Sequence, residues 1–149
     1  MLLIGIKNTG TQTVLADGII NIGSVYRKYC KKNNCGVTTF SRTVNDVTLQ
    51  QSGIYNVSAT FTFTAETAGD VIIQLLENGD AVEGATLTET ITTPTTEIRT
   101  ATIDYKILVD NDCVLGRNST LAKTISFINA SDAVDITVSN VVVNVTKEV

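Results

Sequence analysis

The sequence predicts an all-β protein built as an antiparallel sandwich. Residues 52–65 alternate at period two, with an apolar set on one side and Asn, Ser and Thr on the other, which is typical of a half-buried strand. Further short runs rich in β-branched residues are separated by Gly and Asn turns. No window combines apolar residues at helical spacing with capping signals, so we expect no helix of ordinary length. The apolar set of the long strand is Tyr55, Val57, Ala59, Phe61, Phe63 and Ala65.

The chain has 149 residues, which suits a single domain over 1–149. A domain of this size buries roughly 68–70% of its unfolded surface, enough for a core without a metal or disulfide. The net charge is −4, which argues against a nucleic-acid partner because phosphate binding relies on clustered cations. A basic run is the local exception, and we interpret it as the solvated edge of a hairpin. It comprises Arg27, Lys28, Lys31 and Lys32.

No apolar run approaches the roughly 20 residues that span a bilayer, so we expect no membrane partner. The start of the chain has neither a basic region nor a small-residue cleavage site, and we do not expect it to be a secretory signal. Its apolar residues predict a first strand. Because residues 1–23 precede the better patterned part of the chain, they are also a possible N-terminal extension for docking. The docking side chains would be Leu2, Leu3, Ile4 and Ile6.

The first third of the chain is expected to hold short, weakly patterned strands. Asp17-Gly18 is a common hairpin dipeptide and would join two of them. Asn33 and Asn34 tolerate the left-handed backbone of a turn. The expected strands are at 2–6, 13–15, 19–22, 25–29, 37–40 and 47–49.

The rest of the chain shows clearer signals. Asn78-Gly79 directly follows a predicted strand and is a strong turn signal. In the last segment the apolar phase slips near Ser139-Asn140, which predicts a β-bulge within one long, bent strand. We also expect the strand at 70–77 to pair with the long strand at 52–65 as a central hairpin. The remaining strands are expected at 85–93, 98–109 and 121–128.

The residues that most often carry catalysis are missing. The chain has no His, which removes Ser-His-Asp and Cys-His mechanisms. Glu77, Asp80 and Glu83 surround one turn and could supply a glycosidase pair only if held across a cleft; we interpret them as solvated. We therefore expect no enzyme.

We expect no cofactor and no metal. Zinc sites usually need four Cys or His ligands, and the chain has three cysteines, an odd number. Cys30 and Cys35 could close a small loop, but reduced thiols are favoured for a protein made in the cytosol. Residues 110–112, with Asp110 and Asp112, offer oxygen ligands for Ca²⁺ but lack the Gly and bidentate Glu of an EF-hand loop.

Residues 47–61, VTLQQSGIYNVSATF, resemble the central G-x-Y-x-V strand of C1q/TNF-like jelly rolls, with Gly53, Tyr55 and Val57 in the matching places. The following strand ends in Asn78-Gly79, as is usual in that family, and the closing strand at 134–146 fits its long last strand. The similarity covers roughly residues 24–149. The resemblance implies a jelly-roll fold and a tight homotrimer.

The family includes domains of bacteriophage fibres, collars and capsid decorations. The chain has no collagen-like stalk and few aromatic residues, which favours that branch over secreted complement proteins or cytokines. The resemblance therefore implies a non-enzymatic virion protein, made in the host cytoplasm, whose partners are copies of itself and other virion proteins. The alternative is a receptor-binding module that recognises a host cell-surface glycan or protein through loops such as 109–119 or 78–84.

Some apolar residues fall on faces that strict alternation would leave to solvent. A monomer rarely exposes a contiguous apolar patch, and obligate interfaces are apolar like a divided core. These residues therefore predict a subunit interface, with packing under loops as the alternative. They are Ile54, Ile72, Leu76 and Val142.

Overall fold

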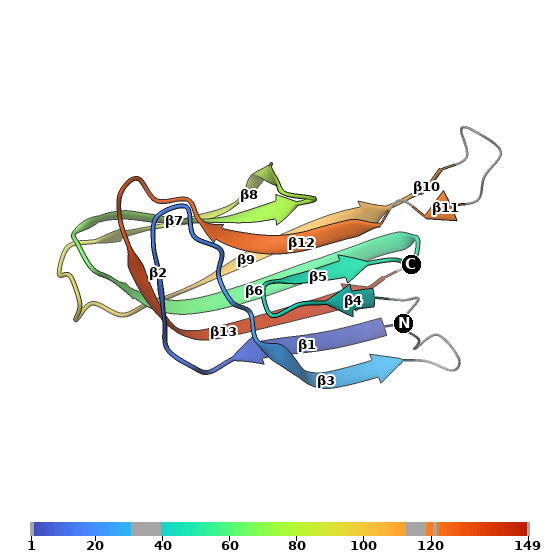
Figure 1. Ribbon diagram of the computed structural model, residues 1–149, viewed down its shortest axis with the longest axis horizontal. Coiled ribbons are helices and arrows are strands. Elements are labelled where there is room, and N and C mark those ends of the chain that lie inside the picture. The colour runs from blue at the N-terminus through green and yellow to red at the C-terminus, as the bar shows by residue number, and fades with distance from the viewer. Residues whose placement is uncertain (1, 31–39, 113–118, 121, 149) are drawn as a thin grey trace.

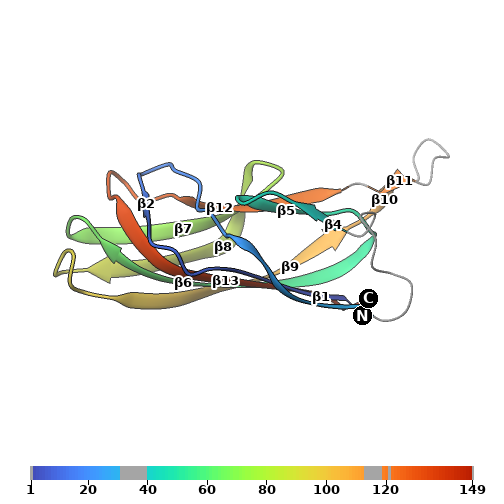
Figure 2. The same cartoon turned by 60° about the horizontal axis from the view of Figure 1, so that its bottom comes forward.

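The structure is a computed structural model that describes residues 2–30, 40–112, 119–120 and 122–148. Over these residues all regular structure is strand, arranged as two antiparallel sheets packed face to face (Figures 1 and 2). The predicted all-β sandwich is confirmed. Most of the strand expected at 37–40 lies outside the described residues, as do Cys35 and Cys113, and the side chain of Cys30 is not described either.

Sheet A has the order β3-β1-β13-β6-β9, and β2 pairs with the start of β13. Sheet B has the order β4-β5-β12-β7-β8, and β10 and β11 form a small separate hairpin. Sheet A contains β1 (Leu2–Asn8), β2 (Gln12–Val14), β3 (Ser24–Cys30), β6 (Gly53–Ala65), β9 (Arg99–Val109) and β13 (Ile136–Lys147). Sheet B contains β4 (Phe40–Arg42), β5 (Asp46–Leu49), β7 (Gly69–Glu77), β8 (Asp80–Ile91) and β12 (Lys123–Asn129); the hairpin is β10 (Asn111–Asp112) and β11 (Ser119–Thr120).

The predicted hairpin between β6 and β7 is wrong. β6 pairs with β13 and β9 in sheet A, whereas β7 pairs with β12 and β8 in sheet B. The two strands are neighbours in sequence but lie in opposite layers, because each has one apolar face and the two faces bury each other across the sandwich. Such crossing between layers is the connectivity of a jelly roll.

β6 supplies the centre of the core, as its alternation predicts. All six of its inward side chains, from Tyr55 to Ala65, are fully buried. Phe61 meets Phe127 of β12 across the sandwich, with ring centroids 5.2 Å apart and an angle of 67° between the rings. Edge-to-face contact of this kind stabilises the core beyond the area it buries.

The predicted bulge in the last strand is confirmed. The register between β13 and β6 shifts between Val138 and Asn140, which leaves Ser139 as the extra residue. Ile136 and Val138 are buried before the shift, and alternate residues from Val141 are buried after it. The bulge therefore keeps one face of a long strand apolar across a change of phase. The predicted Asn78-Gly79 turn is also confirmed, with φ of 53° and 85° at the two residues.

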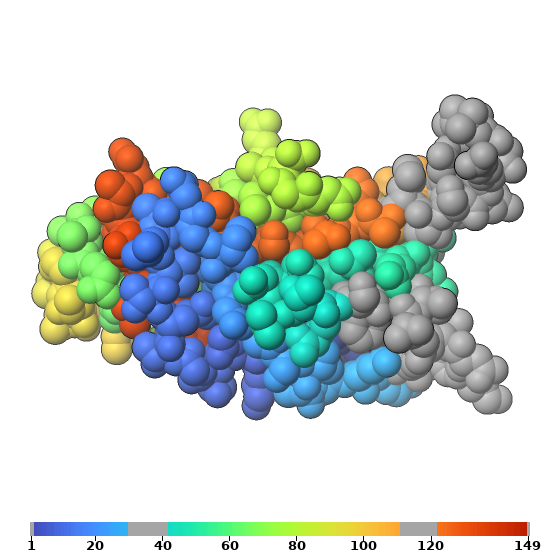
Figure 3. All heavy atoms as spheres, in the orientation of Figure 1, coloured from blue at the N-terminus to red at the C-terminus, as the bar shows by residue number. Residues whose placement is uncertain are grey.

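The segment that follows β1 is part of the sandwich and does not extend from it. β2 pairs with β13 in sheet A, and the chain then crosses to sheet B, where the amide of Ile20 donates to the carbonyl of Phe127 at 2.9 Å. Val14, Ile20 and Ile22 are buried in the core. Figure 3 shows this blue segment packed against the body of the molecule. Asp17-Gly18 makes a turn here, but no hairpin forms, because its two arms pair with different sheets.

Candidate functional site

The four residues that predict a subunit interface lie on two opposite faces of the molecule. Ile54 in β6 and Val142 in β13 point outward from sheet A, whereas Ile72 and Leu76 in β7 point outward from sheet B. Within sheet A, Val142 pairs with Thr60 of β6, which is six positions or about 20 Å from Ile54 along the strand. The structure therefore does not bring the four together as one patch.

Ile72 and Leu76 are only partly exposed. The amide of Ile72 donates to the hydroxyl of Ser131 at 2.8 Å, and its carbonyl accepts from the amide of Ala130 at 2.8 Å. Leu76 lies opposite Ser126 on β12 and opposite Ala81 on β8. Both side chains are thus partly buried within the single chain, and an interface on the outer face of sheet B stays a prediction.

Ile54 has a partner that the sequence analysis missed. Leu108 lies directly opposite it on β9, and the two side chains are 38% and 60% exposed. Directly opposed residues share one face of a sheet, so they form a single apolar patch on sheet A. An ion pair between Lys106 and Glu148, with 2.8 Å between nitrogen and oxygen, borders it. Leu108 could have been found from the sequence, because it lies on the opposite face of β9 from the alternating apolar residues Ile103, Ile107 and Val109.

The Ile54–Leu108 patch lies beside an edge of the sandwich formed by two long end strands. β9 and β8 are edge strands of their sheets, and they lie next to each other on one side of the molecule. In the part of the chain that the structure describes, each pairs with a neighbour on one side only. Long unpaired edges favour pairing with another chain. An apolar patch next to such an edge is the best candidate surface for self-association.

The predicted docking residues are mostly inside the protein. Leu2, Ile4 and Ile6 are buried in the core, because β1 lies between β3 and β13 in sheet A. Leu3 alone of the four points outward, and it is partly buried. Residues 2–8 therefore do not form a free docking strand in this structure.

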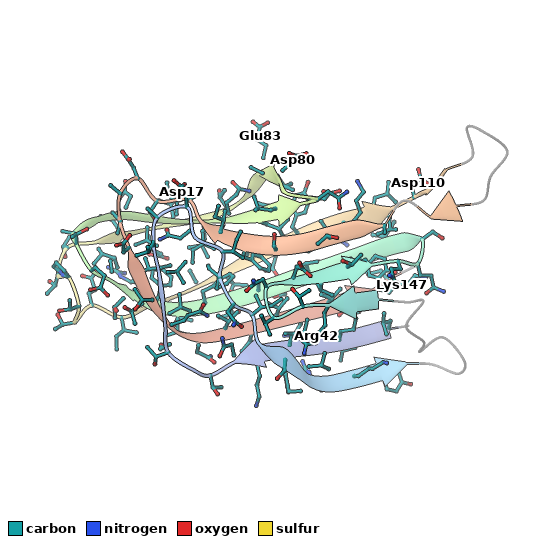
Figure 4. All side chains as sticks on the ribbon, viewed as in Figure 1. Asp17, Arg42, Asp80, Glu83, Asp110 and Lys147 are labelled. Carbon is teal, nitrogen blue, oxygen red and sulfur yellow. The ribbon has the colours of Figure 1, made fainter. Side chains whose placement is uncertain are left out.

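The carboxylates around the β7–β8 turn do not converge. Glu77 forms an ion pair with Lys123 at 2.6 Å, and both line a shallow depression next to the turn. Asp80 is exposed at the rim of the same depression, and Glu83 is exposed and projects away from the body of the molecule (Figure 4). A glycosidase needs two carboxylates facing each other across a substrate, and these three do not meet that requirement.

Among the described residues, no group of three or more His, Cys, Asp or Glu side chains lies close enough to hold a metal ion. The side chains of Asn111 and Asp112 are not described, so the alternative of Ca²⁺ binding at 110–112 has no structural test. Within the same described ranges, the structure contains no helix that is long and apolar enough to cross a membrane.

No family model and no curated protein sequence matches the chain. Its fold nevertheless resembles solved structures over nearly the whole length of both chains. The globular domain of zebrafish complement 1qA protein has a TM-score of 0.61 at 7% identity and covers 100% of this chain and 98% of its own. The Eiger TNF of S. frugiperda has a TM-score of 0.65 at 11% identity and covers 100% and 92%.

Murine APRIL gives a TM-score of 0.63 at 5% identity and covers 97% of this chain and 98% of its own. At identities this low the likeness concerns the fold alone. Two antiparallel sheets with alternating connections, together with these neighbours, identify the fold as a C1q/TNF-like jelly roll.

Proposed function

We propose that the protein is a non-enzymatic structural component of a bacteriophage virion, assembled as a homotrimer. The observation that carries the trimer is the Ile54–Leu108 patch beside the free edge formed by β8 and β9. An apolar centre with a charged rim is the usual anatomy of a protein interface. The resemblance of the sequence to phage-type C1q/TNF-like jelly rolls supports both three-fold assembly and the place in a particle.

Light scattering coupled to size exclusion measures the assembly directly. The expected mass is about three times 15.9 kDa, and a clean monomer at micromolar concentration would refute the trimer. Leu108→Glu places a charge in the centre of the patch and should yield monomers. Ile98→Glu changes a residue that is 67% exposed outside the patch and should leave the mass unchanged.

A third variant distinguishes the two faces. Leu76→Glu alters the outer face of sheet B, where the sequence analysis also placed interface residues. If this variant dissociates the assembly and Leu108→Glu does not, the interface lies on sheet B and the patch on sheet A has another role. Because Leu76 is partly exposed, the variant should still fold.

The place in a virion is tested by mass spectrometry of particles from a phage that carries the gene, after density-gradient purification. The chain should band with the particles in a fixed ratio to the major capsid protein. Recovery only in the soluble fraction of the lysate would refute a virion role and leave the trimer untouched.

A further inference from the structure

A bulge in β3 places two consecutive side chains on the same face of sheet A. The register between β1 and β3 shifts so that Gly5 pairs with Arg27 and Ile6 pairs with Val25, which leaves Tyr26 as the extra residue. In a regular strand Tyr26 and Arg27 would point to opposite faces. Here both lie over Gly5, since a Cβ added to Gly5 would be 2.6 Å from Cγ of Arg27 and 2.9 Å from Cε1 of Tyr26. Bulges often redirect side chains in this way next to functional sites.

The redirected side chains form a cationic cluster around one ring. Nζ of Lys7 lies 4.9 Å from the ring centroid of Tyr26, and Cζ of Arg27 lies 5.4 Å from it. Both distances are within the range of cation–π attraction. Nη2 of Arg27 also donates to Oδ1 of Asn144 at 3.0 Å. Both charged groups thus contact the ring of Tyr26, and Asn144 fixes that of Arg27, on an exposed surface.

Within the described residues, neither Lys7 nor Arg27 takes part in an ion pair; the four ion pairs found there use Arg99, Lys106 and Lys123. Along the row of side chains that crosses sheet A from Arg27, the first carboxylate is that of Asp104 on β9, at the far edge. The chain carries a net charge of −4. Two cations without a carboxylate partner, on an acidic protein, favour an anionic ligand from outside.

An open aromatic ring lies next to the cations. Tyr29 is 57% exposed and follows Arg27 by two residues, so it shares the outer face at a spacing of about 7 Å. A tyrosine ring combines an apolar face with a polar tip, which suits the C–H face and hydroxyl groups of a sugar. The two exposed rings of Tyr26 and Tyr29 lie on a sheet face, outside the loops 109–119 and 78–84 that were expected to bind a receptor.

We propose that Lys7, Tyr26, Arg27 and Tyr29, here called the β3 face, form a binding surface for acidic carbohydrate. A sugar ring stacks on Tyr29, and its carboxylate, sulfate or phosphate pairs with Arg27 and Lys7. Arg27 suits this role because its planar guanidinium matches such oxyanions with two parallel hydrogen bonds. Tyr26 positions the two cations. Gly5 is required because any side chain there would displace Arg27.

The β3 face and the Ile54–Leu108 patch are separate on sheet A. β3 and β9 are the opposite edges of sheet A, four strand spacings or about 19 Å apart. The two proposals fail in different measurements: light scattering for the assembly and ligand titration for the surface.

The test is calorimetric titration of the intact protein, in the assembly state it adopts on purification. The probes are oligogalacturonate, sulfated dextran, phosphorylated mannan and neutral dextran. At least one acidic carbohydrate should bind, more weakly at higher salt, and neutral dextran should not. The carboxylate, sulfate and phosphate arms identify the anionic group. Failure of all three acidic probes at millimolar concentration would overturn the proposal.

Variants locate the site. Arg27→Gln and Lys7→Gln should each weaken binding about tenfold, the loss of one close charge pair. Tyr29→Ala should weaken it at least fivefold without any change of charge. The matched control is Lys106→Gln, which removes a cation from the same sheet face at the β9 edge and should stay within twofold. Equal losses in Lys106→Gln and Arg27→Gln would show diffuse attraction and overturn the site.

Two further probes separate sugar from charge alone. Polyglutamate and a single-stranded oligonucleotide carry comparable negative charge, but neither is a polysaccharide. Both should bind at least tenfold more weakly than the best acidic carbohydrate. Equal or tighter binding of either probe would show that the β3 face takes polyanions in general or nucleic acid, and the carbohydrate proposal would be wrong.

Discussion

The β6–β13 pair and the segment from Thr9 to Gly23 enter the same core but are held there by different forces. β6 and β13 pair along most of their lengths and bury alternate apolar side chains. The segment from Thr9 to Gly23 buries only a few side chains and has one short strand, β2. Its position depends on hydrogen bonds from polar groups far away in the sequence.

Asn129 is the centre of those hydrogen bonds. It is fully buried, and its Nδ2 donates to the carbonyls of Val14 at 3.2 Å and Val134 at 2.9 Å. Its backbone carbonyl accepts from the amide of Asp17 at 2.7 Å. Its Oδ1 accepts from the hydroxyl of Ser131 at 2.6 Å. A periodic apolar strand can thus be recognised alone, whereas an irregular segment needs a partner that satisfies its backbone.

The largest effect is expected from Phe61→Ala. It removes the ring that meets Phe127 at the centre of the core, and such truncations cost about 3–5 kcal/mol of unfolding free energy. Urea unfolding followed by fluorescence or circular dichroism measures this cost. Thr62→Ala, on the outer face of the same strand, removes a 3.1 Å hydroxyl contact with Thr100 and should cost about 1 kcal/mol or less. Similar costs for the two would mean that the centre of the sandwich is not tightly packed.

Asn129→Ala should cost about 2–4 kcal/mol, because buried carbonyls that lose their donor cost about 1–3 kcal/mol each. Its distinguishing effect is local. The amides of Asp17 and Ile20, which donate to β12 residues, should exchange hydrogen much faster, while those of β6 keep their relative protection. Asp132→Ala, an exposed change in the loop that follows β12, is the control. Uniform loss of protection over both regions would show that the segment and the central pair unfold as one unit.

The same contrast explains what could be predicted from sequence. Alternation identified the buried face of β6 and the phase slip located the bulge at Ser139, since both are local patterns. Alternation shows which face of a strand is buried but not which strand lies next to it in the sheet. This is why the sequence led to the wrong prediction that β7 pairs with β6. The position of the irregular segment could not be predicted, because its bonding partner Asn129 lies more than a hundred residues away.

The candidate surfaces follow the same rule. Ile54 was found because it breaks the alternation, but its partner Leu108 becomes visible only when β6 and β9 are placed side by side. Ile72 and Leu76 break the alternation equally and belong to the other sheet. The cluster at Tyr26 and Arg27 depends on a bulge opposite Gly5, for which the sequence shows no change of apolar phase.

Two glycines provide a smaller and sharper comparison. Gly23 and Gly79 have nearly the same backbone angle, φ of 87° and 85°. A Cβ at Gly23 would lie 2.1 Å from the carbonyl oxygen of Lys7, whereas a Cβ at Gly79 would meet nothing within 4 Å. Gly79→Ala should therefore cost only the left-handed backbone, about 1–2 kcal/mol. Gly23→Ala should cost about 1–3 kcal/mol more, because packed neighbours must move. Equal losses of unfolding free energy for Gly23→Ala and Gly79→Ala, measured by urea unfolding, would show that the neighbours of Gly23 move aside at no further cost.

Tyr55→Phe should have the smallest effect at neutral pH and a distinct effect in alkali. The hydroxyl of Tyr55 donates to the carbonyl of Gln51 at 2.6 Å, and its loss should cost about 1 kcal/mol. Burial raises the pKa of Tyr55 from 10.0 to about 12, so the folded state favours the protonated phenol. That contribution to stability is complete below pH 10 and is lost as the pH rises from about 10 to 12.

The expected loss is about 2.7 kcal/mol, from 1.36 kcal/mol per pKa unit. Denaturant unfolding of the wild type and Tyr55→Phe at pH 7, 10 and 12 measures it as the change in the difference between the two proteins. All other ionisable groups are the same in the two proteins, so their contributions to the difference cancel. The wild type should lose its advantage and become the less stable protein near pH 12. A constant difference across this range would show that water reaches the phenol at the end of β6, and that the central pair is less well sealed than its alternation indicates.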